Sequence, residues 1–257
     1  MTVLEAPPAP APASPSTELT WFEHLGELRR RVLISLAALV VGVIVAWFLY
    51  DRALVFMIAP YREYLAHHPR IDISHGNLVA TGPLEGFTTR LKVSCYLGVI
   101  VAAPVWIWQA WRFVSPGLHR HERRYAASFT ASAVALFALG AATAVVVFPK
   151  AIAWMISVSG TGVAPLFSPG RYLGLYSLAA VVFGAVFTYP VFLVGLELVG
   201  VVSSAKLRHW RRYAIVLLCA VAAVVTPSND PFSFLAMALP MIVFYEAAIL
   251  VGRILHR

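Results

Sequence analysis

Residues 32–50 read VLISLAALVVGVIVAWFLY, a run of 19 residues without a single charge. A helix needs about 20 apolar residues to cross the hydrocarbon core of a bilayer. The run begins directly after the three arginines at positions 29–31 and ends at Asp51. This pattern predicts a membrane-spanning helix with charged residues at both of its ends.

Similar apolar runs follow along the rest of the chain. They cover residues 91–111, 126–148, 172–199, 213–225 and 232–251. Together with residues 32–50 they predict an all-α integral membrane domain of six transmembrane helices, occupying residues 20–257. The fifth run has only 13 residues, which taken alone also suits a buried or re-entrant segment. A short span remains possible where the bilayer thins.

The composition supports the membrane class. Hydrophobic residues make up 60% of the chain and charged residues 12%, whereas soluble domains carry about 25% charged residues. Residues 1–19 are rich in Pro and Ala and lack the apolar core of a signal peptide, so they predict a disordered tail. Cys95 and Cys219 both lie in apolar stretches and predict packing residues rather than a disulfide framework.

The distribution of basic residues predicts the orientation. With six spans and a cytoplasmic N-terminus, 13 of the 20 Lys and Arg residues fall on the cytoplasmic side and seven on longer outer segments. This bias follows the positive-inside rule and favours an N-in, C-in topology. The two long outer segments, Asp51–Arg90 and Pro149–Arg171, predict structured extracytoplasmic loops with a helical cap.

Two carboxylates lie among arginines in the predicted cytoplasmic segments. Thr20 and Glu23 fit a capping box, which predicts a helix start just before the first span. On that helix, Glu27 has two alternatives: an i,i+4 pair with Arg31, or presentation to a cationic ligand. Glu122 lies among basic side chains, where a local salt bridge is the simplest role.

Five short stretches resemble motifs of the TatC family, and they keep their order and spacing from Thr20 to Glu246. These stretches are His24-Leu25-Gly26-Glu27-Leu28-Arg29, Ala59-Pro60, Pro83-Leu84-Glu85-Gly86-Phe87 with Lys92, Phe113 through Arg124 with Pro116-Gly117-Leu118 and Glu122-Arg123-Arg124, and Thr226-Pro227 followed by Asp230, Phe232-Ser233, Ala238, Pro240 and Tyr245-Glu246. Each motif alone is weak, whereas the ordered set is specific.

The resemblance implies the receptor and core subunit of the twin-arginine (Tat) protein translocase, a multi-pass protein of the bacterial cytoplasmic (inner) membrane. TatC proteins bind the twin-arginine signal peptides of folded cargo and nucleate its export, using the proton-motive force and no cofactor. The implied partners are TatA- and TatB-type single-span subunits and further copies of the chain. Carried onto this sequence, the signal-peptide site comprises Glu27, Glu122, Phe113, Arg29 and Leu25.

The resemblance also marks residues with structural or partner-contact roles: Pro60, Glu85, Phe87, Pro116, Thr188, Asp230 and Glu246. Thr188 departs from the family, which often has a glutamate before the proline of the fourth span. A threonine can keep a hydrogen bond across helices but cannot carry a charge. Glu197, near the cytoplasmic end of that span, is expected to reach the interface. Glu246 is expected to pair with a cytoplasmic arginine such as Arg253.

Other functions fit the sequence less well. An enzyme needs a nucleophile motif or a cluster of His and acidic residues with metal spacing, and neither is present in the sequence. A solute transporter is the main alternative, and it normally has charged residues near mid-span or broken spans in matching halves. The predicted spans are almost wholly aliphatic and aromatic, which favours a protein that acts through its surfaces.

Overall fold

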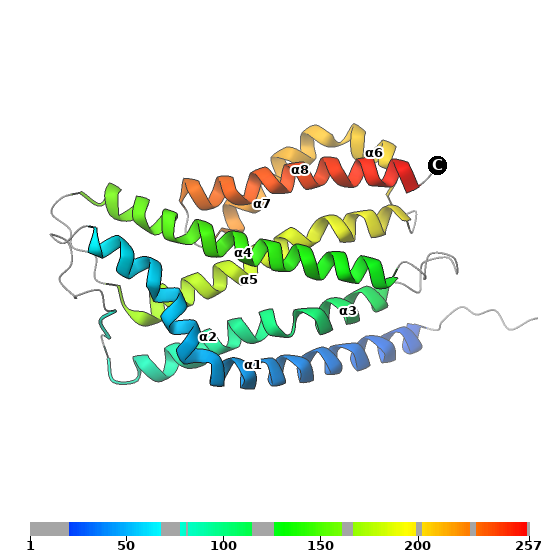
Figure 1. Cartoon of the computed structure of the whole chain (residues 1–257). Helices are drawn as coiled ribbons and strands as arrows, with labels where there is room; N and C mark the ends of the chain where they lie inside the picture. The colour runs from blue at the N-terminus through cyan, green and yellow to red at the C-terminus, as the bar shows by residue number, and fades with distance from the viewer. Residues whose placement is uncertain are drawn as a thin grey trace, which may run out of the picture.

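The computed structural model describes residues 21–67, 78–80, 82–114, 126–160, 167–198, 202–226 and 230–255. All regular secondary structure in these ranges is α-helical, and the helices form an elongated bundle (Figure 1). The all-α class is therefore confirmed. The disordered tail predicted for residues 1–19 lies outside the described residues.

The bundle contains helices of very different lengths. Their bounds are α1 (Trp21–Ala66), α2 (Glu85–Val101), α3 (Ala103–Val114), α4 (Ala126–Val158), α5 (Pro169–Leu198), α6 (Ser204–His209), α7 (Arg211–Val225) and α8 (Pro231–Leu255). The helices α1, α4, α5 and α8 are long and apolar enough to cross a bilayer, and α2 with α3 provides a fifth candidate span. The 15 residues of α7 extend about 22 Å at 1.5 Å per residue, short of a core about 30 Å thick.

The second predicted span, residues 91–111, is divided where a single helix was expected. The axes of α2 and α3 differ by 54°, and the break falls at Ala102. Pro104 explains the bend, because proline lacks the N–H that would bond to the carbonyl of residue 100. Near the break, the indole N–H of Trp106 donates to the carbonyl of Val99, seven residues earlier, at 3.1 Å.

The first helix is much longer than the predicted span of residues 32–50. It continues as a helix to Ala66, with Pro60 inside it, and turns across the bundle in its second half (Figure 1). Arg90 of α2 donates to the carbonyl of Trp47 at 3.1 Å and lies over the rings of Trp47 and Tyr50. A side chain that bonds to helix carbonyls in this way is a recognised cause of helix bending.

The second half of α1 forms the predicted helical cap at one end of the bundle. Met57, Tyr61 and Leu65 are buried there in one core cluster with residues of α4 and α5. The Tyr172 hydroxyl donates to the carbonyl of Met57 at 3.2 Å, which ties the cap to α5. The helix α4 likewise continues past Pro149 to Val158. Part of both long segments predicted as loops is therefore regular helix.

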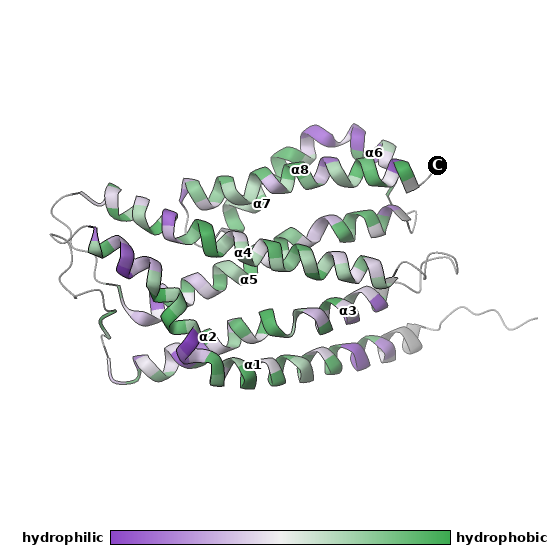
Figure 2. Ribbon diagram, in the orientation of Figure 1, coloured by the Kyte–Doolittle hydropathy of each residue, from purple (hydrophilic) through white to green (hydrophobic). Residues whose placement is uncertain are grey.

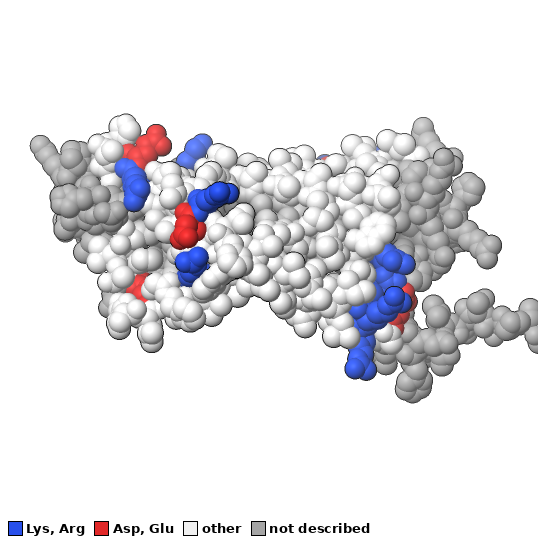
Figure 3. All heavy atoms as spheres, turned by 60° about the horizontal axis from the view of Figure 1, so that its bottom comes forward, with Lys and Arg blue, Asp and Glu red and all other residues white. Residues whose placement is uncertain are grey.

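The centre of the bundle is α5, which packs against α2, α4 and α8. In its most apolar stretch 56% of the residues are buried, against 11% in α1, whose apolar side chains face outward. A green, hydrophobic band runs along the helices in Figure 2, and on the face in Figure 3 the charged side chains gather towards the two ends. This distribution is typical of a protein with a lipid-facing belt.

Two glycines allow α4 and α5 to cross closely. A Cβ atom on Gly140 of α4 would lie 2.8 Å from the carbonyl carbon of Phe183 and 2.8 Å from the Cβ of Phe187. In the reverse direction, a Cβ on Gly184 of α5 would meet the ring of Phe137 at 2.8 to 3.0 Å. Small residues at such crossings let helix backbones approach in membranes, where no hydrophobic force between helices is available.

Candidate functional site

One end of the bundle carries most of the predicted signal-peptide residues. The helix α1 begins there, α3 and α8 end there, and α4 starts there (Figure 1), and it is called the N/C end below. Glu27 lies in the second turn of α1 and forms an ion pair with Arg31, one helical turn further on. The i,i+4 pair predicted from the sequence is thus confirmed. The side chains of the predicted capping box, at positions 20 and 23, lie outside the described ones.

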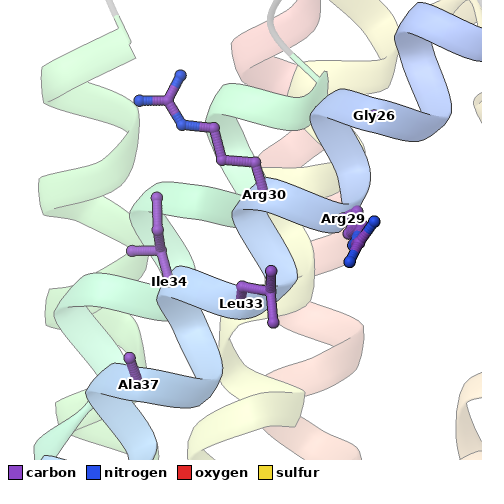
Figure 4. A pocket seen from close by; sticks show the side chains of 6 residues that line it. All are labelled: Gly26, Arg29, Arg30, Leu33, Ile34 and Ala37. Atoms are coloured by element: carbon purple, nitrogen blue, oxygen red, sulfur yellow. The ribbon is translucent and has the colours of Figure 1, made fainter.

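Two further arginines of α1 border a shallow cavity of about 460 Å³ beside Glu27. Arg29 and Arg30 leave the helix on opposite sides, as Figure 4 shows. Leu33, Ile34 and Ala37 line the cavity over the next turns. Two arginines and three apolar side chains thus line this cavity, and its charge is opposite to that of Glu27. Arg29 lies two residues after the predicted binding carboxylate on the same helix.

The third helix brings Phe113 to the same end of the bundle. It lies half-buried one residue before the end of α3 and next to the exposed Arg112. Before it, the buried Trp111 stacks on Phe129 of α4 with ring centroids 4.9 Å apart. That stacking packs the last turns of α3 against α4. Glu122, Pro116 and the side chain of Leu25 lie outside the described residues.

In α5, Thr188 and Glu197 both differ from the expectation. The Thr188 hydroxyl is buried and donates to the carbonyl of Gly184 at 2.9 Å, so its hydrogen bond stays within α5 and does not cross to another helix. Glu197 does not reach an interface, since its exposure is 0%. Its carboxylate lies against Gly252 of α8, where a Cβ atom would overlap it. Only glycine leaves room for this carboxylate between the helices.

Asp230 is the N-cap of α8. Its Oδ1 accepts the backbone N–H of Ser233 at 2.7 Å, and Pro231 occupies the first helical position, where its missing N–H costs nothing. The carboxylate is buried, at 2% exposure, beside an end of α8 that carries partial positive charge. These contacts give Asp230 a structural role, that of a helix cap.

Removing this cap should destabilise the protein measurably. We expect Asp230→Ala to lower the free energy of unfolding by about 1–2 kcal/mol, because a helix N–H loses its acceptor. Asp230→Asn should keep most of the stability, since an amide oxygen also caps. The thermal midpoint of the purified protein in detergent measures the difference. Glu63→Ala is the control, as Glu63 is exposed near the end of α1. Equal midpoints for Asp230→Ala and the control would contradict the capping role.

Glu246 of α8 pairs with Arg211 at the start of α7 and not with Arg253. The expected pairing with an arginine is confirmed, although the partner is not Arg253, the example given. Arg211 comes close because α7 packs along α8, an arrangement that no local sequence pattern announces. The neighbouring Tyr245 hydroxyl donates to the carbonyl of Leu207 at 2.9 Å, which holds α6 to the same helix. These contacts give Glu246 a structural role.

At the opposite end, Glu85 joins α2 to α5. Its Oε1 accepts the backbone N–H of Gly170 at 3.3 Å, and Thr89 lies against the same glycine. Lys92, one turn further, packs over Gly174, so a polar row on α2 faces two glycines on α5. Thr89 and the two glycines were not predicted to have a role from the sequence. The available signals were the spacing of Glu85, Thr89 and Lys92 by four and three residues, and the Gly-x-x-x-Gly pattern of the two glycines. Phe87 is exposed, and the centroid of its ring lies 6.1 Å from that of the Trp47 ring.

No cluster of three or more His, Cys, Asp or Glu residues that could hold a metal is found in the part of the chain that the structure describes. The two cysteines are both free thiols on different helices. The described polar groups of the candidate site at the N/C end are the Glu27 carboxylate and the guanidinium groups of Arg29, Arg30 and Arg31. Such groups can recognise charged side chains of another molecule.

Comparison with known proteins assigns the chain to a family. The family described as Sec-independent protein translocase protein (TatC) matches residues 23–240. The chain belongs to the TatC family. The match contains Glu27, Phe113, Glu122 and Thr188, and it confirms the resemblance seen in the motifs. As a TatC-family chain with several apolar helices, it is a membrane protein of a protein-transport family.

Individual TatC proteins are similar along most of this chain. The "Sec-independent protein translocase protein TatC" of Frankia casuarinae is 39% identical over 234 residues, which is 90% of this chain and 64% of that protein. The chain thus spans less than two thirds of the Frankia protein. The TatC of Xylanimonas cellulosilytica is 37% identical over 227 residues, covering 88% of this chain and 81% of that protein.

A solved TatC structure has the same fold. The crystal structure described as "Twin Arginine Translocase Receptor- TatC in DDM" superposes with a TM-score of 0.75 and 30% identity. The match covers 90% of this chain and 99% of that one. The helices of this chain therefore have a TatC-type arrangement.

Proposed function

We propose that this chain is the receptor and core subunit of a twin-arginine translocase. It binds the twin-arginine signal peptides of folded proteins and nucleates their export across the bacterial cytoplasmic membrane, driven by the proton-motive force. The observation that carries the proposal is the position of Glu27 at the N/C end. The chain between α3 and α4, which contains Glu122, departs from and returns to that same end.

The chemistry of a paired-arginine ligand fits two carboxylates on separate segments. A guanidinium group forms two parallel charge-assisted hydrogen bonds with one carboxylate. A lysine ammonium group cannot reproduce this fork, so the site selects arginine. Glu27 from α1 and Glu122 from the α3–α4 connection would each take one arginine. Phe113, Arg29 and Leu25 complete the proposed binding surface.

The proposal includes a topology of six spans with both termini in the cytoplasm. It counts α7 as a sixth, short span, which requires a locally thinner bilayer or snorkelling flanks such as Arg211 and Arg212. The proposed membrane domain comprises residues 20–257. The cap made by the second half of α1 then lies on the outer face. TatA- and TatB-type subunits and further copies of the chain are the proposed partners.

Site-specific crosslinking in native membranes tests the proposal. A twin-arginine precursor and a twin-lysine control are presented to the native chain and to its Glu27→Ala and Glu122→Ala variants. We expect a crosslink only with the twin-arginine precursor, and its loss in both variants. Glu63→Ala removes an exposed carboxylate from the other end of α1 and should crosslink like the native chain. Equal crosslinking of both precursors, or of neither, would overturn the receptor assignment.

A further inference from the structure

The carboxylate proposed to receive a signal arginine already holds an arginine of its own chain. The Arg31 guanidinium contacts Glu27 Oε1, and Glu27 precedes Arg31 by four residues, the favourable order for a helical ion pair. The side chain of Arg31 is 12% exposed and that of Glu27 32% exposed. The pair is therefore partly buried, and Glu27 is its more accessible partner.

The Arg31 guanidinium is only partly satisfied in this position. Its Nε atom is buried and has no hydrogen-bond partner among the described residues. A single contact through one terminal nitrogen leaves the two-bond fork of the group unused. An arginine approaching from outside, free to orient its guanidinium plane, can make both bonds to the carboxylate.

We propose that Arg31 is an internal occupant of the Glu27 site, which an incoming signal arginine must displace. This inference rests on the proposed function, since it requires that Glu27 binds an arginine of the signal peptide. The exchange replaces one guanidinium with another at the same carboxylate. Glu27 thus keeps a partner before and after binding, and the free receptor never exposes an unpaired carboxylate among three arginines.

Arg31 raises the apparent dissociation constant of every peptide and leaves the ratio between two peptides unchanged. When only a fraction of the receptor is competent to bind, the apparent dissociation constant of every ligand rises by the same factor. Arg31 therefore weakens twin-arginine and twin-lysine peptides equally. A ligand of low intrinsic affinity is excluded at working concentrations, although the ratio between the two ligands stays constant.

Peptide binding to the purified full chain in detergent tests the inference with a matched pair of variants. Arg31→Gln removes the occupant, whereas Arg30→Gln removes the same charge from the next residue, which lines the cavity beside Glu27. We expect Arg31→Gln to bind the twin-arginine peptide about threefold more tightly than Arg30→Gln does, or about 0.7 kcal/mol at 1.4 kcal/mol per tenfold. The twin-lysine peptide should gain by the same factor.

The outcomes separate the two proposals. If the native chain binds the twin-arginine peptide no better than the twin-lysine peptide, the receptor function itself fails. If that preference holds but Arg31→Gln and Arg30→Gln bind alike, the receptor function stands and the internal occupant is overturned. Should Arg31→Gln not fold, Arg31→Met and Arg30→Met carry the same comparison, because methionine keeps an unbranched side chain and removes the charge that pairs with Glu27. A gain confined to Arg31→Met supports displacement.

Discussion

Replacing Gly140 with leucine is expected to abolish the stable folded protein. A side chain at this position would enter the backbone of α5, whose Phe183 carbonyl carbon lies 2.8 Å from the place of the Cβ atom. A flexible side chain can relieve a clash by changing its rotamer, whereas backbone atoms cannot. The helices α4 and α5 must therefore separate. Overpacking of a core usually costs about 1–3 kcal/mol, and a clash with backbone at the central crossing should reach the top of that range or exceed it.

The yield of monodisperse protein and its thermal midpoint in detergent measure this effect. Gly86→Leu is the control, since a Cβ atom there meets nothing within 4 Å. Gly140→Ala should fall between the control and the leucine variant. If Gly140→Leu matched Gly86→Leu in yield and midpoint, the close crossing of α4 and α5 would not be a determinant of the fold.

Glu27→Gln should weaken the binding of a twin-arginine peptide by about tenfold to a hundredfold. The amide keeps the size of the side chain but removes the charge, and a hydrogen bond to a charged group contributes about 1.5–3 kcal/mol. Part of this loss is offset, because the variant no longer pairs with Arg31 in the free state. Titration of labelled peptide against the purified chain gives the dissociation constants directly.

Glu63→Gln is the control for this second experiment. It makes the same substitution on the same helix, at an exposed position near the other end of α1. Glu122→Gln should resemble Glu27→Gln, and the double variant should multiply the two losses if each carboxylate receives its own arginine. A double variant no weaker than either single variant would mean that the two carboxylates do not bind separate arginines.

The sequence predicted those parts of the fold that depend on local pattern. The apolar runs located every long helix, and the spacing of Glu27 and Arg31 predicted their ion pair. The resemblance marked Asp230 for a structural or partner-contact role, and its contact as an N-cap spans only three residues. Each of these features involves residues no more than a few turns apart.

What could not be predicted depends on contacts between distant segments. The bend of α1 involves Arg90 of α2, and the burial of Glu197 depends on the space left by Gly252. The pairing of Glu246 with Arg211 follows from the packing of α7 on α8. At the candidate site, the carboxylates were assigned by family resemblance, since local composition alone gave salt bridges as the simplest role.

The tie between the α1 cap and α5 has a consequence for how the chain is assembled. Met57 and Tyr172 are 115 residues apart. At a synthesis rate of roughly 5–20 residues per second, Tyr172 emerges about 6 to 23 s after Met57. During that interval the second half of α1 lacks the α5 surface on which it packs. Membrane insertion of the first helix and completion of its final shape are therefore separate events, and the nascent chain must wait for α5 before this cap can close.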